Sequence, residues 1–67
     1  MSVAKVTEIT STSKKSFEDA IEKGIARAHK TLRNVKGAWV ASQKVKCDDG
    51  VITSYRVDLK VTFVLTD

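Results

Sequence analysis

The sequence predicts an α+β fold with the element order β-α-β-β. Three observations predict it: β-branched residues dominate the first ten positions, apolar residues then recur at helical spacing, and two extended stretches later flank an Asp-Gly pair. The chain has 67 residues, 42% of them apolar, and carries 12 Lys and Arg against 8 Asp and Glu. This length accommodates one domain, residues 1–67.

The first half of the chain predicts a strand followed by a helix. Residues Val3–Thr10 form the strand. Ser13 is the predicted N-cap, because a serine hydroxyl can accept a hydrogen bond from the free N–H groups of a first helical turn. From Lys14 to about Arg33, one helical stripe collects the apolar side chains: Phe17, Ala20, Ile21, Ile25, Ala28 and Leu32. Gly24 lies in this stripe and costs about 1 kcal/mol of helix propensity, which indicates close contact with the sheet or a neighbouring chain.

The second half predicts a long hairpin. The stretches Gly37–Cys47 and Val51–Leu65 are joined by Asp48-Asp49-Gly50, and Asp-Gly between β-like runs is a strong hairpin signal. The second stretch alternates, with apolar residues from Tyr55 to Leu65 on one face and polar residues on the other. The apolar row is therefore predicted to face the helix.

A two-residue turn at Asp49-Gly50 would fix the pairing of the two strands. Asp48 would then pair with Val51, and counting back gives three further pairs on the face away from the helix: Gln43 with Arg56, Ala41 with Asp58, and Trp39 with Lys60.

Trp39, the only Trp of the chain, is thus predicted on an exposed face. A large exposed ring there either packs against another subunit or offers a stacking platform for a planar aromatic ligand, with Gln43 and Arg56 as donors beside it. The sequence leaves both roles open.

The lengths of the elements predict self-association. Fifteen strand residues reach about 50 Å at ~3.4 Å each, whereas twenty helical residues reach about 30 Å at ~1.5 Å each. One helix cannot cover that apolar row, so its uncovered end and the sheet edges require other subunits of a homo-oligomer.

Catalysis has no positive support in the sequence. A single His (His29) and a single Cys (Cys47) cannot build a zinc cage, and no catalytic set or phosphate-binding loop is recognisable. No apolar run is long enough for a membrane span, the basic residues are too dispersed for a nucleic-acid surface, and the lone Cys suits the reducing cytoplasm. We therefore expect a cytoplasmic protein that is not an enzyme.

The chain resembles the dodecin family along essentially all 67 residues. The likeness lies in the strand SVAKVTEI, the helical segment TSTSKKSFEDAIEKGIARAHKTLRNV, and the strands GAWVASQKV and SYRVDLKVTFVL. It implies a three-stranded antiparallel sheet wrapped around one helix, and twelve subunits assembled as a hollow homododecamer. It also implies a protein that binds, stores or buffers riboflavin or FMN at subunit interfaces.

The resemblance also implies a flavin site with two changed residues. Flavin-binding dodecins stack the isoalloxazine ring on a Trp of the second strand and hold its edge with a Gln of the third, and these positions carry Gly37 and Arg56 here. Trp39 stands two residues beyond Gly37 on the same face, about 7 Å away. Arg56 donates but cannot accept hydrogen bonds, so it suits a phosphate or carboxylate.

The predicted cofactor-binding residues are Trp39, Arg56, Gln43 and Gly37, and no residue is assigned to a metal. The alternative is a dodecin shell without ordinary flavin binding, which carries another anionic ligand such as coenzyme A, or calcium.

Overall fold

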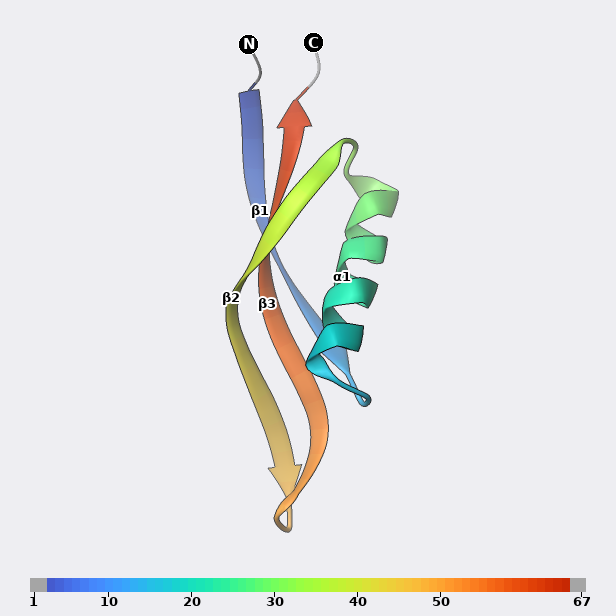
Figure 1. Cartoon of the computed structure of the whole chain (residues 1–67), viewed down its shortest axis with the longest axis vertical. Helices are drawn as coiled ribbons and strands as arrows, with labels where there is room; N and C mark the ends of the chain where they lie inside the picture. Colours follow the sequence, from blue (N-terminus) through green and yellow to red (C-terminus); the bar gives the residue numbers. More distant parts are fainter. Residues whose placement is uncertain (1–2, 66–67) are drawn as a thin grey trace.

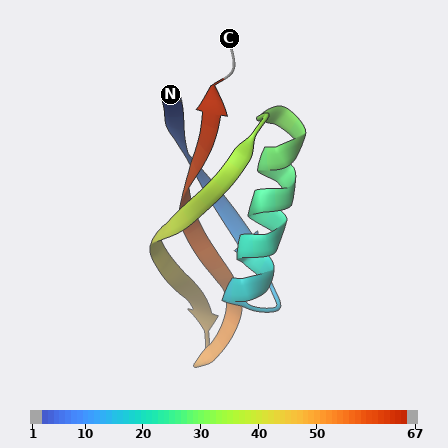
Figure 2. The ribbon, with the colours of Figure 1, turned by 45° about the horizontal axis from the view of Figure 1, so that its top comes forward.

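A computed structural model describes residues 3–65 and contains the predicted order of elements. The elements are β1 (Val3–Ser13), α1 (Phe17–Thr31), β2 (Val35–Asp48) and β3 (Val51–Leu65) (Figure 1). The three strands form one antiparallel sheet in the order β1-β3-β2, so β3 pairs with both other strands. Figure 2 shows the strands twisting past one another, with α1 on one side of the sheet. Within residues 3–65, no helix has the length and apolarity to cross a membrane.

Ser13 and Ser16 both accept backbone hydrogen bonds at the start of α1. The predicted N-cap, Ser13, was wrong. The cap is Ser16, whose hydroxyl accepts a hydrogen bond from the Asp19 N–H at 3.0 Å. Ser13 is the buried last residue of β1; its hydroxyl accepts from the Lys15 N–H at 2.9 Å and donates to the Asp19 carboxylate. Because Ser13 holds the turn before the helix, β1 runs three residues beyond its predicted end and α1 is shorter than predicted at both ends.

The core lies between α1 and the central strand. Val57, Leu59 and Val61 of β3 are almost fully buried and pack on Ala20 and Ala28 of the helix. The apolar row of β3 therefore faces the helix, as its alternation predicted. Partly buried side chains complete this core: Ile9, Phe17, Ile21, Ile25, Leu32 and Val35.

The sheet extends beyond both ends of the helix. The molecule measures 51 × 19 × 13 Å, whereas the 15 residues of α1 span about 22 Å at ~1.5 Å per residue. Figure 1 shows the β2–β3 hairpin below α1 and the other end of the sheet above it. Large apolar side chains are exposed along the sheet: Val3, Val6, Trp39, Val40, Val45, Val51, Ile52 and Leu65. The predicted mismatch of lengths is confirmed.

The hairpin turn is as predicted, since Asp48 pairs with Val51 while Asp49 and Gly50 both have positive φ, as a tight two-residue turn requires. The pairing beyond the turn is only partly as predicted. Trp39 does pair with Lys60. Gln43, however, pairs with Val57 rather than Arg56, and Asp58 pairs with Ser42 rather than with Ala41.

Two β-bulges that offset each other explain this difference. Thr53 is the extra residue on β3 and Ala41 the extra residue on β2, so the register shifts by one between them and returns at Val40. The Thr53 hydroxyl donates to the carbonyl oxygen of Lys46 at 3.1 Å and so satisfies an acceptor beside one bulge. As a result Gln43 points to the helix side of the sheet, the same side as Val57.

Gly24 marks a close approach of the helix to the sheet, as its place in the apolar stripe indicated. A Cβ atom at this position would lie 3.0 Å from the Cδ1 of Leu59 and 3.1 Å from the Cβ of Ser11. Leu59 is itself buried among the core valines, so it has little room to move away.

We predict that Gly24→Val destabilises the protein, because three added carbons would overpack this contact at a typical cost of about 1–3 kcal/mol. Thermal unfolding measures the effect. Ala26→Val, on the exposed side of the same helix, is the control and should change the melting temperature much less. Equal melting temperatures for the two variants would contradict the close approach.

Candidate ligand-binding site

The candidate site lies on the face of the sheet opposite α1, which we call the outer face. Each rung of this face takes its middle residue from β3 and one flanking residue from each edge strand. Three successive rungs, in the order β1-β3-β2, are Glu8–Lys60–Trp39, Thr10–Asp58–Ser42 and Thr12–Arg56–Lys44. The outer face is therefore polar, with one large aromatic ring at the edge strand β2.

Trp39 is placed on this face as predicted and is 51% exposed. The Lys60 ammonium lies over its ring, with Nζ 5.7 Å from the ring centroid. Such a contact at an exposed site contributes about 0.5–1 kcal/mol. A planar ligand can therefore stack on the opposite face of the indole, or displace a flexible lysine at modest cost.

Gly37 shares the outer face with Trp39, one rung further along β2, where it pairs with Thr62. A Cβ atom at Gly37 would meet nothing within 4 Å, and its backbone does not require positive φ. The protomer thus has open space at Gly37, beside Trp39 on the outer face.

Asp58 ties the three strands together at the centre of the outer face. Its carboxylate accepts hydrogen bonds from the Ser42 hydroxyl at 2.6 Å and from the Thr10 hydroxyl at 2.9 Å. These two hydrogen bonds, that from Ser42 first, lower the pKa of Asp58 below its ordinary value of 3.8. Ser42 was not predicted to belong to this site, because the extra residue Thr53, between the turn and Ser42 in the pairing, is what moves Ser42 opposite Asp58.

Arg56 does not lie beside Trp39. Its Nε is 3.8 Å from the nearer Asp58 oxygen, beyond hydrogen-bond distance, and its side chain is 54% exposed. Arg56 is four residues along β3 from Lys60, the partner of Trp39, which corresponds to about 13 Å. Gln43 is further removed, since it belongs to the helix side of the sheet. The structure therefore brings Trp39 and Gly37 together and separates both from Arg56 and Gln43.

The spacing of Gly37 and Arg56 has a consequence for a shared ligand. Gly37 pairs with Thr62, six residues from Arg56, so the two positions are about 20 Å apart in one protomer. One flavin ring cannot contact both from a single chain. A ring that touches both positions must lie between two subunits.

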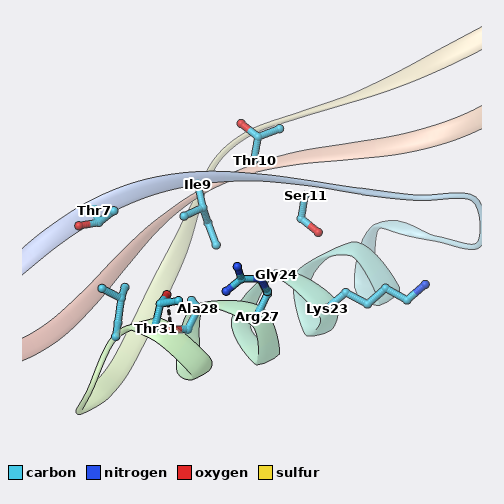
Figure 3. A pocket seen from close by; sticks show the side chains of 10 residues that line it. Thr7, Ile9, Thr10, Ser11, Lys23, Gly24, Arg27, Ala28 and Thr31 are labelled. Atoms are coloured by element: carbon cyan, nitrogen blue, oxygen red, sulfur yellow. Dashed lines mark hydrogen bonds between the residues drawn. The ribbon is translucent and has the colours of Figure 1, made fainter.

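A pocket lies between α1 and β1, away from the outer face, and none of the four predicted site residues lines it. Its volume is about 410 Å³ and its lining combines hydroxyl and aliphatic side chains (Figure 3). Arg27 lies between the helix and β1, whereas Lys23 extends along the helix (Figure 3).

In residues 3–65, no three His, Cys, Asp or Glu side chains are grouped so that they could hold a metal ion, and both His29 and Cys47 are exposed.

Comparison with known proteins decides the family, because the dodecin family model matches residues 3–66. The chain belongs to the dodecin family. The calcium dodecin of Mycobacterium tuberculosis is 35% identical over 63 residues, which cover 94% of this chain and 89% of that protein. A solved structure of the same relative, which has a calcium-binding site, has a TM-score of 0.81 at 34% identity, and the match covers 96% of this chain and 91% of that one.

Two other dodecins superpose more closely. The Streptomyces davaonensis dodecin has a TM-score of 0.93 at 35% identity and covers 98% of this chain and 97% of that one. An arginine-to-alanine variant of the Thermus thermophilus dodecin has a TM-score of 0.94 at 33% identity over the full length of both chains. The β-α-β-β fold with its three-stranded antiparallel sheet is thus the dodecin subunit fold.

We predict that the contribution of Asp58 to stability depends on pH. A lowered folded-state pKa means that the carboxylate stabilises the fold fully above its ordinary, unfolded-state pKa of 3.8, and that this stabilisation is lost as the pH falls through the folded-state pKa. Asp58→Asn should therefore lower the melting temperature at pH 7, and its difference from the native protein should shrink below about pH 4.

Thermal unfolding between pH 3 and 7 checks this prediction. Asp48→Asn, which removes the same charge from the exposed hairpin turn, is the matched control. A difference between native protein and Asp58→Asn that stays constant over the whole range would contradict the role assigned to the two hydroxyl hydrogen bonds.

Proposed function

We propose that this dodecin is a non-enzymatic, cytoplasmic flavin-binding protein that stores or buffers riboflavin or FMN as a homododecamer. Residues 1–67 form one domain, and Trp39 provides the stacking surface. The observation that carries the proposal is the half-exposed ring of Trp39 on the outer face, beside the open space at Gly37.

Exposed apolar surface supports the assembly. Valine, isoleucine and leucine side chains stay uncovered on the parts of the sheet that overhang α1, and β1 and β2 both leave an edge open. The small core of a 67-residue chain gives only marginal stability, so this exposed apolar surface favours association with other copies. Copies of the same chain that cover these surfaces would also bring one protomer's Trp39 near another protomer's polar residues, as the separation of Gly37 and Arg56 requires.

The chemistry of the outer face supports an aromatic, partly anionic ligand. Trp39 offers a flat apolar surface, for which a stacked ring gains about 0.5–1.5 kcal/mol beyond its burial. Arg56 offers charged donors to carbonyl or phosphate oxygens. Gln43 was a predicted polar contact, but its place on the helix side of the sheet removes it from the site that we propose.

A second candidate is a dodecin that holds a different anionic ligand, such as coenzyme A. The observation that favours it is the pair Gly37 and Arg56 at the two positions where flavin-binding dodecins carry Trp and Gln. The name of the M. tuberculosis relative makes calcium a third ligand to test. A flavin titration run beside titrations with coenzyme A and with calcium separates these candidates.

We predict that Trp39→Ala abolishes the quenching of flavin fluorescence but leaves the assembly intact. A half-exposed ring contributes less to stability than a buried aromatic, whose removal typically costs about 3–5 kcal/mol. Fluorescence titration measures binding, and native mass spectrometry measures the number of subunits, for which we expect twelve.

Trp39→Phe, which keeps an aromatic ring, is the control and should retain partial quenching. A Trp39→Ala protein that dissociates readily, and whose remaining shells quench flavin normally, would show that the ring has a structural role instead.

We further predict that riboflavin binds the native protein more weakly than it binds the double variant Gly37→Trp, Arg56→Gln. The variant restores a stacking ring where the protomer has room for it, and an amide that both donates and accepts. One stacking contact of about 0.5–1.5 kcal/mol corresponds to roughly two- to tenfold in Kd. Fluorescence titration of both proteins with riboflavin tests this, and equal affinities would mean that these positions do not control the site.

A further inference from the structure

The outer face carries a second feature, a basic pocket next to the hairpin. It has a volume of about 300 Å³ and is lined by Thr12, Lys44, Val45, Lys46, Ser54 and Arg56. Three of these side chains are cations and two carry hydroxyls. Arg56 pairs with both Thr12 and Lys44, while Lys46 pairs with Ser54, so the polar groups occupy two adjacent rungs.

The cations of this basic pocket are close together. Residues that pair directly have Cβ atoms about 5 Å apart, and next-but-one residues of a strand are about 7 Å apart. Lys44 therefore lies near both Arg56 and Lys46. Three long, flexible cationic side chains at these separations can converge on one oxyanion.

Little negative charge is available inside the protomer to balance them. Over residues 3–65, the ion pairs within 4.0 Å are Lys23–Asp19 and Arg56–Asp58, so neither lysine of the pocket is paired with an acid. Asp58 already accepts hydrogen bonds from two hydroxyls, and Arg56 stays 3.8 Å from it. An anion in the pocket would relieve the mutual repulsion of the three cations.

We propose that this basic pocket binds a phosphate monoester, and that its occupant is the terminal phosphate of FMN. The identity of the occupant rests on the proposed flavin function. Tetrahedral phosphate oxygens match a set of arginine, lysine and hydroxyl donors, and charge-assisted hydrogen bonds are about twice as strong as neutral ones.

The distance along the sheet fits this ligand. The rung of Trp39 is about 13 Å from the rung of Arg56 on the same face. FMN carries its phosphate at the end of a five-carbon ribityl chain, an extended length of the same order. The rung between them presents Asp58, Thr10 and Ser42 to the hydroxyls of that chain. Riboflavin, which lacks the phosphate, would leave Lys44 and Lys46 without an anionic partner.

The test compares three proteins. They are the native protein, Lys44→Gln with Lys46→Gln, and the control Lys14→Gln with Lys30→Gln, which removes the same two charges from exposed positions outside the basic pocket. FMN and riboflavin are titrated by fluorescence at low salt, and inorganic pyrophosphate is titrated by calorimetry. Native mass spectrometry checks that each variant assembles.

We expect FMN to bind the native protein and the control about tenfold more tightly than riboflavin, since one charge-assisted phosphate contact is worth roughly a factor of ten. In the Lys44→Gln, Lys46→Gln variant this ratio should fall towards one while riboflavin affinity stays unchanged. Pyrophosphate should bind the native protein and the control but not this variant.

Two different results would distinguish a failure of the phosphate site from a failure of the proposed flavin function. Equal affinities for FMN and riboflavin in the native protein, without pyrophosphate binding, would overturn the phosphate site and leave flavin binding intact; a carboxylate of another subunit that fills the pocket would give this outcome. Pyrophosphate binding that depends on the two lysines, without binding of either flavin, would overturn the flavin function and the FMN assignment but support the phosphate site.

Discussion

The alternation of side chains along β3 is the constraint on which the rest of the structure depends. As the central strand, β3 pairs with β1 from Tyr55 to Leu65 and with β2 from Val51 to Phe63, so its side chains form the middle of both faces of the sheet. One face buries Val57, Leu59 and Val61 against α1, and the other face presents Arg56, Asp58 and Lys60, which form the middle of the three rungs of the outer face. Core and candidate site are thus the two sides of one strand, only a backbone apart.

Two hydroxyl groups, one from each edge strand, donate hydrogen bonds to Asp58 at the centre of this arrangement. A carboxylate on a partly exposed sheet gains from two neutral donors that fix its rotamer, one from each edge strand. The edge strands β1 and β2 do not pair with each other, and within residues 3–65 the Asp58 side chain accepts a hydrogen bond from each of them. The two hydrogen bonds thus add a side-chain link to the backbone ladders that hold the strands of Trp39 and the basic pocket.

Much of this fold could be predicted from the sequence because local signals agree with the tertiary structure. The alternation of β3, the stripe of α1, the Asp49-Gly50 turn and the close contact at Gly24 are all present. The N-cap could not be chosen, since Ser13 and Ser16 both offer a suitable hydroxyl and only the end of β1 decides between them.

The candidate site was predicted less completely, because its membership depends on the two bulges. Trp39 lies beyond both bulges and keeps its predicted face, whereas Gln43 lies between them and changes sides. One signal was present: Val40 and Val45 are an odd number of residues apart, so both can face the helix side only if one residue between them is left out of the alternation. Without the partner strand in view, that residue could not be located.

The two bulges at Ala41 and Thr53 also decide which residues of β2 can change without affecting the core. Between them, the even-numbered positions of β2 belong to the outer face and the odd-numbered positions belong to the side that packs towards α1. Lys44 and Lys46 are exposed side chains of the outer face, so a neutral or acidic residue can replace either lysine without disturbing the core. Within one unchanged backbone, the preference for a charged ligand can drift from lineage to lineage while the subunit fold stays constant.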